Sequence, residues 1–426
     1  LYITVVGVIL AMFPATLDET IIATSMNVIA SEFNSQADVT WLATSYLLTM
    51  TAFSPIYGKL SDIFGLRLTM LTSIFTFMVA SLLGALSPGM VYLIVFRAIS
   101  GVAAAGLTSL ALIAISKITP EESRGKYLGY LGVLYAVTGV LGPVIGGILT
   151  DKASWRWNFY LNIPLCVVAF AIIYFVLRVP VPRGSYWSKL KRVDYVGIVL
   201  FIGAVVIFLL ALQWGGKDYA WDSATIIGLL VGSAALMAIF IWYELRWTPE
   251  PTFELHLAKV RNVWVSCLLG FTIGWVLLVI IYYIPLYYQY VHQYTAMPAG
   301  LQLLPFLIPL NVIAIAAGFI TERWGCYKLV SVLGLALSAL GTGLFYLISA
   351  EVSVAVVGVA LGFAGLGVGL SIQMSIIPAQ QQVGFALISQ VTSFISFTRL
   401  IGGVFGISVV GAIINNTLES QAQTIM

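Results

Sequence analysis

Long apolar runs separated by short polar turns make up this chain of 426 residues. A helix that crosses a membrane needs about 20 mostly apolar residues. On that rule we expect thirteen helices, at residues 1–31, 39–60, 67–87, 90–118, 125–150, 158–178, 193–214, 222–246, 261–290, 297–320, 327–349, 352–380 and 387–415. Alternation of apolar and polar residues with a period of two is not seen in these runs, so a β-barrel is not favoured.

The composition places these runs in lipid. Hydrophobic residues make up 60% of the chain and charged residues 9%, whereas a soluble domain carries about 25% charged residues. The three cysteines (Cys166, Cys267 and Cys326) lie far apart and form no CxxC pair. The sequence shows no metal-ligand cluster, no paired catalytic carboxylates on a loop and no phosphate loop. We therefore expect no metal site, no cofactor and no enzymatic activity.

The basic residues are unevenly distributed among the loops. Most Lys and Arg residues follow the even-numbered runs, and the odd-numbered loops hold only Lys152, Arg156 and Lys217. Loops rich in Lys and Arg stay in the cytosol. The pattern predicts cytosolic even-numbered loops and a cytosolic N-terminus.

One polar turn between two apolar runs recurs 260 residues later. The first copy is Gly58-Lys-Leu-Ser-Asp-Ile-Phe-Gly-Leu-Arg67, and a second pair of glycine runs keeps the same offset. The equivalent positions are Gly58 and Gly318, Asp62 and Glu322, Gly65 and Gly325, Gly142 and Gly402, and Gly146 and Gly406. Internal repeats of this kind are how many transporters build alternating access.

The offset also predicts the domain organisation. Six runs precede the insertion and two fill it, so we expect an all-α polytopic membrane protein with two six-helix bundles and two inserted helices. The expected parts are an N-terminal bundle at 1–178, a linker with the inserted helices at 179–260, and a C-terminal bundle at 261–426. Five helices of the second bundle fall within the sequence, which leads us to expect a fourteenth helix beyond it. A protein of thirteen helices is the alternative.

Four ionisable residues interrupt the apolar runs, namely Asp18, Glu19, Arg97 and Arg399. Such residues inside a membrane are costly and usually functional. At about 1.5 Å per residue, Asp18 and Arg97 lie at similar depth in the outer half of the bilayer. Pairing with Arg97 keeps Asp18 ionised, whereas a desolvated carboxyl without a partner favours its neutral form. The pair is a candidate for proton coupling, and a structural ion pair between two helices is the alternative.

Other polar residues in the runs are candidates for a substrate cavity. Glu19 lies about 100° around the helix from Asp18, so the two acids face different neighbours. Arg399 is placed to balance an acid or to meet an anionic substrate group. Aromatic faces attract cations, and the run 281–290 is rich in tyrosine. The cavity candidates are Glu19, Tyr135, Trp275, Tyr283, Gln289, Asn311, Gln373 and Arg399.

The repeated turn is a candidate cytosolic gate. Asp62 is placed to accept hydrogen bonds from backbone N–H groups at a nearby helix N-terminus, and Arg67 to hold a carboxylate across the cleft. The gate is expected to comprise Gly58, Asp62, Gly65, Arg67, Glu322 and Arg323. Such contacts close the cytosolic side while the outer side is open.

A glycine run lies in the fifth helix at Gly142, Pro143, Gly146 and Gly147. Glycines at a spacing of four residues let helices approach closely. Proline removes one backbone hydrogen bond and favours a kink. This motif suits a contact about which a bundle rocks, and ordinary small-residue packing is the alternative.

These motifs together resemble the major facilitator superfamily. The turn at 58–67, Val95-Phe-Arg-Ala-Ile-Ser-Gly101 and the glycine run at 142–147 are similar to its motifs, with Leu66 and Thr138 as departures from the usual residues. Leu17-Asp-Glu-Thr-Ile-Ile22 and the two inserted helices resemble the fourteen-helix drug:proton antiporter branch. Finer similarity to fungal members lies in the segments 41–46, 124–127, 155–160 and 212–216.

The resemblance implies proton-coupled antiport. Fungal members include multidrug and toxin exporters and vacuolar basic amino acid transporters, so the expected substrate is a small cationic or amphipathic organic solute. The alternatives are a solute sensor on the same fold and a proton-independent facilitator. The expected partners are membrane lipid and a small molecule, with no nucleic acid, and the expected state is a monomer. The expected location is the plasma membrane or the vacuolar membrane.

Overall fold

In the computed structural model, the described residues are 2–36, 38–120, 123–179, 185–216, 218–248, 251, 254–294, 296–347 and 354–425. Helices dominate these ranges, and no strand longer than a single bridge occurs within them. The helices of the N-terminal part are α1(Tyr2–Ile21), α2(Met26–Glu32), α3(Trp41–Phe53), α4(Ile56–Phe64), α5(Leu66–Ala85), α6(Met90–Ile118), α7(Arg124–Lys152), α8(Trp157–Tyr160) and α9(Asn162–Val176).

The second part of the chain continues in the same way. A short helix and two long ones precede the remainder. These helices are α10(Tyr186–Lys191), α11(Tyr195–Trp214), α12(Ala224–Arg246), α13(Arg261–Tyr290), α14(Ala296–Leu301), α15(Leu304–Trp324), α16(Tyr327–Leu344), α17(Val354–Met374), α18(Ile377–Gln381) and α19(Ile388–Ile425).

The number of spans agrees with the apolar runs. Among the described residues, twelve helical segments are long and apolar enough to cross a membrane. The remaining run, 39–60, is divided into α3 and α4 between Phe53 and Ile56. Pro55 lies at this break, and proline has no backbone N–H to continue the ladder of helical hydrogen bonds. The helix after 387 extends past the predicted end at 415 to Ile425.

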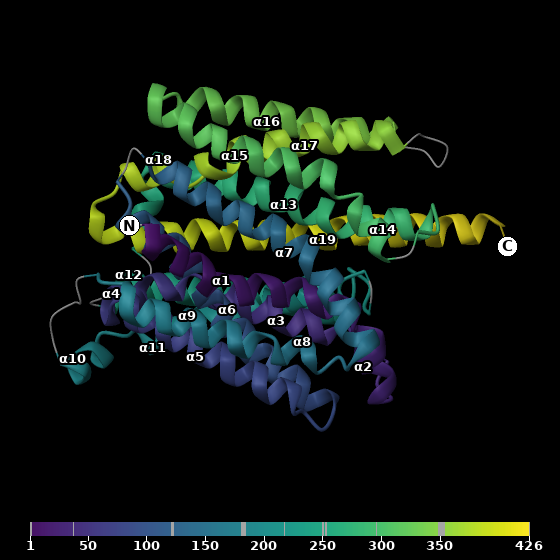
Figure 1. Ribbon diagram of the computed structural model, residues 1–426, viewed down its shortest axis with the longest axis horizontal. Helices are drawn as coiled ribbons and strands as arrows, with labels where there is room; N and C mark the ends of the chain where they lie inside the picture. Colours follow the sequence, from purple (N-terminus) through teal and green to yellow (C-terminus); the bar gives the residue numbers. More distant parts are fainter. Residues whose placement is uncertain are drawn as a thin grey trace.

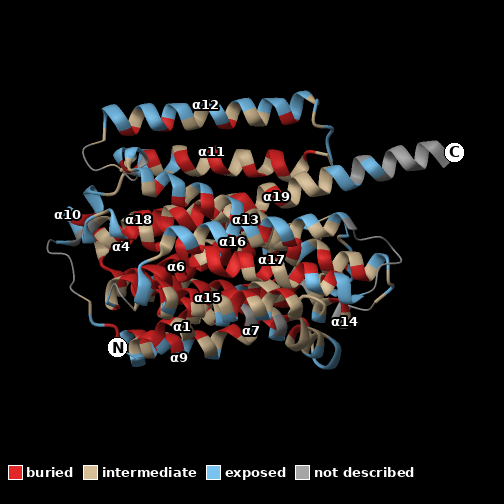
Figure 2. Ribbon diagram, turned by 90° about the horizontal axis from the view of Figure 1, so that it is seen from above, coloured by how far each residue is buried: buried red, intermediate tan, exposed pale blue. Residues whose placement is uncertain are grey.

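Helices of the N-terminal part and helices α13–α19 form two side-by-side groups, and α10, α11 and α12 are seen with the N-terminal group in this view (Figure 1). We call the end that carries α4, α10 and α18 the basic end, and the end that carries α2, α8 and α14 the opposite end. The helix α6 is deeply buried at the centre, while α12 is largely exposed (Figure 2). Phe201 of α11 and Phe240 of α12 pack in one apolar cluster with Ala52 of α3 and Phe397 of α19. The inserted helices therefore contact both groups.

Equivalent glycines pack in equivalent ways in the two repeats. A Cβ atom added to Gly142 of α7 would overlap Thr20 of α1, and one added to Gly402 of α19 would overlap the backbone of Phe271 in α13. The fifth membrane-spanning helix of each repeat (α7 and α19) therefore lies against the first (α1 and α13) at a place where only glycine fits.

Candidate functional site

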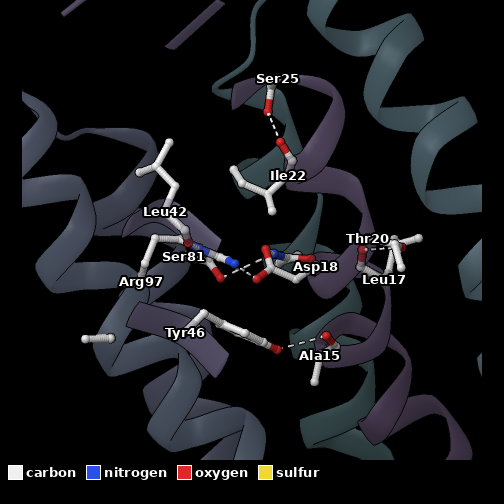
Figure 3. A network of polar contacts seen from close by, with 12 residues as sticks. Ala15, Leu17, Asp18, Thr20, Ile22, Ser25, Leu42, Tyr46, Ser81 and Arg97 are labelled. Atoms are coloured by element: carbon white, nitrogen blue, oxygen red, sulfur yellow. Dashed lines mark hydrogen bonds and ion pairs between the residues drawn. The ribbon is translucent and has the colours of Figure 1, made fainter. Parts of the chain in front are cut away.

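The predicted ion pair forms between α1 and α6. Arg97 Nη1 contacts Asp18 Oδ2, and both residues are 1% exposed. Arg97 Nε also donates to the backbone carbonyl of Leu42 at 2.9 Å, and its guanidinium carbon lies 4.3 Å from the ring centroid of Tyr46. Figure 3 shows these groups converging from three helices. Two buried charges are thus held inside the apolar bundle by each other and by further polar contacts.

Further hydrogen bonds complete the surroundings of Asp18. Asn162, at the start of α9, donates through Nδ2 to Asp18 Oδ1 at 3.0 Å and lies 3.4 Å from Ser81 Oγ. The Tyr46 hydroxyl donates to the carbonyl of Ala15 at 2.9 Å, which fixes the ring beside Arg97 (Figure 3). Both carboxylate oxygens of Asp18 therefore have donors, as a buried charge requires. Protonation of Asp18 would remove the charge that attracts Arg97.

A second site lies between the two bundles. Its cavity is lined by Met50, Ser54, Thr108, Ser109, Leu112, Tyr135, Ser396, Arg399 and Leu400. The space open to the centres of water molecules is about 20 Å³, which holds about one water molecule. The structure thus brings together Tyr135 of α7 and Arg399 of α19, from opposite repeats. Both had been predicted from sequence as cavity residues.

Glu19 lies next to the Asp18 pair and on the same helix, and it is half-buried. Within the described part of the chain, Glu19 makes no hydrogen bond and no ion pair. It interacts electrostatically with Tyr135, which also interacts with Arg399. Glu19 also interacts electrostatically with Asp18 and Arg97, so the two neighbouring acids share the field of one arginine, although only Asp18 forms an ion pair with it.

The other predicted cavity residues do not line this cavity. Trp275 packs against Phe405, and Tyr283 donates to the carbonyl of Ile407 at 2.8 Å, so both tie α13 to α19. Asn311 lies at the contact of α15 with α7 and donates to the carbonyl of Leu307 at 2.7 Å. Gln373 is buried in α17, and Gln289 is half-buried near the end of α13.

At the basic end, Asp62 joins the two repeats. It accepts a hydrogen bond from Lys117 Nζ at 2.9 Å and one from Ser389 Oγ at 2.7 Å. Ser389 lies in the first turn of α19 and donates through its hydroxyl group. The sequence had predicted a donor from a backbone N–H group at a helix N-terminus instead. Gly58, one turn earlier, has no room for a Cβ because Ser389 and Ser393 of α19 lie against it.

Among the described residues, Arg67 makes a different contact from the one predicted. Its Nη2 donates to the backbone carbonyl of Tyr174, and its guanidinium carbon lies 4.8 Å from the ring centroid of the same residue. Tyr174 belongs to α9 of the N-terminal repeat, so Arg67 holds its own bundle together and, among the side chains that the structure describes, reaches no carboxylate across the cleft. Gly65 joins α4 to α5 with a φ of 95°, a backbone conformation that favours glycine.

The second copy of the turn differs from the first. Gly318 of α15 presses on the backbone of Gly125 in α7, which leaves no room for a Cβ. Arg323 is exposed at the end of α15. The backbone of Glu322 lies in the same turn, and its side chain lies outside the described part of the chain.

A buried polar cluster at the basic end was missed from the sequence. Arg124 Nη1 donates to Gln380 Oε1 at 3.0 Å, and Gln380 Nε2 donates to Ser116 at 3.0 Å and to Thr392 at 2.6 Å. Arg124 is 6% exposed and Gln380 2%. The cluster joins α6 and α7 to α18 and α19. Its only sign in the sequence is the short polar break around Gln380 between two apolar runs.

The glycine run of α7 packs within its own bundle. Gly142 and Gly146 lie against Thr20, Ile21 and Thr24, just where α1 ends, while Gly147 has nothing within 4 Å of an added Cβ. Thr20 Oγ1 donates to the carbonyl of Thr138 at 3.0 Å. Pro143 lies inside α7 between the two packed glycines. The motif thus fixes α7 beside the helix that carries Asp18.

Taken together, fold and site define a polytopic membrane transport protein. Residues 8–407 match the family model described as Major Facilitator Superfamily. The chain therefore belongs to the major facilitator superfamily.

Curated relatives cover most of the chain. The efflux pump aflT of Aspergillus parasiticus is 33% identical over 96% of this chain and 80% of its own length. The aspyridones efflux protein of Neocamarosporium betae is 34% identical over 95% of this chain and 72% of its own. The rubrofusarin-specific efflux pump aurT of Gibberella zeae is 32% identical over 96% of this chain and 76% of its own.

Solved structures share the fold at low sequence identity. The proton:xylose symporter XylE superposes with a TM-score of 0.67 at 13% identity, over 99% of this chain and 90% of that one. The human organic anion transporter MFSD10 gives a TM-score of 0.66 at 13% identity, over 97% and 94% of the two chains.

Proposed function

We propose that the protein is a secondary active exporter, which moves a small amphipathic organic molecule out of the cytosol in exchange for protons. The observation that carries the proposal is the buried Asp18–Arg97 ion pair inside a two-bundle transporter fold. Three relatives named as efflux proteins, each at least 32% identical, support export. Proton coupling is our inference from the ion pair.

The proposed proton step is a change in the contacts of one carboxyl group. A proton on Asp18 removes its attraction for Arg97, which keeps its hydrogen bond to the carbonyl of Leu42 and its cation–π contact with the Tyr46 ring. The helices α1, α6 and α9 are then free to shift relative to one another, because Asp18 joins all three. Loss of the proton restores the ion pair and the original packing.

The proposed transport step is alternating access. Among the described residues, the hydrogen bonds that join the two repeats all lie at the basic end. If that end faces the cytosol, as its Lys and Arg residues predict, this conformation is closed to the cytosol. Uptake of cargo then requires these contacts to break.

The test is proton flux in proteoliposomes that contain the full chain and a pH-sensitive dye. Ethidium, arginine and 6-hydroxy-2-naphthoic acid would be added in turn across an imposed pH gradient, to cover cationic, basic amino acid and acidic cargo. We expect one class to cause proton movement, and Asp18→Asn to abolish it. Asp222→Asn, an exposed acid in the loop before α12, is the matched control and should behave as the parent. Gradient-driven transport that persists in Asp18→Asn would exclude Asp18 as the coupling group.

A further inference from the structure

We infer that Arg399 and Tyr135 form a subsite for an acidic oxygen of the ligand, a carboxylate or a phenolate, and that neighbouring hydroxyl oxygens accept a hydrogen bond from the same ligand. The ligand class is thus a hydroxylated organic acid, for which a hydroxylated aromatic acid serves as the probe. The inference rests on the proposed function, because it names the molecule that would bind between the bundles once the contacts at the basic end break. In the closed conformation the cavity holds only about one water molecule. Binding to this cavity is measurable without transport.

The half-buried Arg399 differs from the buried arginines Arg97 and Arg124 in having no polar partner among the described residues. Arg97 is paired with Asp18, and Arg124 is bonded to Gln380. Within the described ranges, Arg399 makes no hydrogen bond and no ion pair, although it lies near the middle of α19 and lines the cavity. A guanidinium group has five N–H donors in a planar fork that matches a carboxylate. An unpaired charge at this depth is costly, and an anionic ligand would supply its partner.

Tyr135 adds a hydrogen-bond donor from the other bundle. Its side chain lines the same cavity as Arg399, and its hydroxyl group has no partner among the described residues. The two residues belong to α7 and α19, so a ligand held by both would bridge the repeats. Gly274 fixes one side of this subsite, because an added Cβ there would overlap the backbone of Arg399.

The hydroxyl oxygens that line the cavity are able to accept a hydrogen bond from a ligand. Thr108 Oγ1 donates to the carbonyl of Ala104 at 2.9 Å, and Ser396 Oγ donates to that of Thr392 at 2.9 Å. Ser54 and Ser109 are bonded to each other at 2.8 Å. With their hydrogens used in this way, these oxygens have lone pairs to offer. They suit a ligand hydroxyl group, while Arg399 and Tyr135 suit its acidic oxygen.

The test compares 6-hydroxy-2-naphthoic acid with its methyl ester, which keeps the ring and hydroxyl group but lacks the charge. Binding to the full chain in nanodiscs at neutral pH would be followed by the fluorescence anisotropy of each ligand. A hydrogen-bonded charge partner should favour the acid by roughly tenfold to a hundredfold. Arg399→Gln should abolish this preference without changing ester affinity, Arg399→Lys should keep part of it, and Tyr135→Phe should reduce it severalfold.

Equal affinity of the parent protein for acid and ester would overturn the inference, as would an unchanged preference in a folded Arg399→Gln protein. Arg246→Gln, which removes an exposed arginine in the last turn of α12, is the matched control and should keep the preference. Thermal unfolding checks that each variant is folded. If Arg399→Gln does not fold, the preference of Tyr135→Phe for the acid decides the question. Acid binding that depends on Arg399 without any proton flux would refute the proposed transport function alone. Proton-driven transport of ester and acid alike would refute the subsite alone.

Discussion

Gly58 and Gly318, 260 residues apart, make equivalent contacts in the two halves of the protein: each presses its helix onto a helix of the other repeat. Gly58 of α4 meets Ser389 and Ser393 of α19, and Gly318 of α15 meets Gly125 of α7. Both contacts lie at the basic end. Closure there is therefore built from two copies of one helix-packing motif, in which a missing side chain allows close approach.

A side chain at Gly58 should prevent this closure. The Cβ of Gly58→Ala would overlap the carbonyl of Ser389 and the side chain of Ser393, and overpacking costs about 1–3 kcal/mol. We expect the closed conformation to lose population by roughly fivefold or more. A water-soluble maleimide added at the basic end should then label a cysteine placed at Ser109 faster. Gly147→Ala, with open space around it, should label at the parent rate, and equal rates in the two variants would contradict the prediction.

The hydrogen bond between Arg124 and Gln380 should act as a second lock on the same end. A hydrogen bond to a charged group contributes about 1.5–3 kcal/mol, so Gln380→Ala should also speed labelling at Ser109→Cys by roughly tenfold or more. Because the two residues share one bond, Arg124→Gln with Gln380→Ala should add less than the sum of the single effects. Full additivity would show that the contact does not stabilise the closed conformation. The exposed Gln381, beside Gln380 in α18, provides the control variant Gln381→Ala.

The sequence predicted a contact well where it depends on how deep two residues lie in the membrane. It predicted a contact poorly where it depends on the neighbour toward which a side chain points. The rise per residue of a helix gives the depth of Asp18 and Arg97, and their pairing followed from it. The direction of Arg67 depends on how α9 packs, which no local pattern reveals, so its contact with Tyr174 was missed. The partner of Arg124 lies in the other repeat, and only the arrangement of the two bundles brings Gln380 to it.

Removal of Arg97 should separate structural from coupling roles of the ion pair. Arg97→Gln leaves the buried Asp18 carboxylate without its cation, and breaking a buried pair in this way costs about 3–5 kcal/mol. Asp18→Asn combined with Arg97→Gln removes both charges and should recover most of the lost thermal stability. The double variant should still show no gradient-driven transport. Thermal unfolding in detergent and proton flux measure the two properties, and proton-driven transport by the double variant would leave the pair a structural role only.

Stability at the opposite end should depend on pH through Glu32. Burial raises the pKa of this carboxyl, but hydrogen bonds from Trp155 and Arg156 outweigh that effect and hold the pKa below its ordinary value of 4.5. Trp155 Nε1 and Arg156 Nη1 donate to the two oxygens of Glu32 at 2.6 and 2.8 Å. A lowered pKa in the folded state stabilises the protein above the unfolded pKa, and this contribution is lost as the pH falls through the folded value.

Glu32→Gln should therefore lower the unfolding temperature at pH 7 and have less effect as the pH falls through the lowered pKa of Glu32, where Glu32 itself becomes protonated. The group is partly exposed, so the change should be modest. Unfolding temperatures between pH 3 and pH 7, roughly the range over which carboxyl groups titrate, provide the measurement. Asp222→Asn removes an exposed acid in the same end of the molecule and should leave the profile unchanged. A constant difference between Glu32→Gln and parent at every pH would show that the charge of Glu32 is not responsible.

Glu19 should weaken the binding of acidic ligands beside Arg399. It is an unpaired acid that interacts electrostatically with Tyr135, as Arg399 does, and like charges in a medium of low dielectric constant repel strongly. At alkaline pH, where Glu19 is ionised, Glu19→Gln should therefore tighten binding of 6-hydroxy-2-naphthoic acid by roughly fivefold to tenfold and leave its methyl ester unaffected. Anisotropy titrations at low and high salt measure both ligands. An equal gain for acid and ester would indicate a change in cavity shape, and weaker binding of the acid would place Glu19 among the groups that hold the ligand.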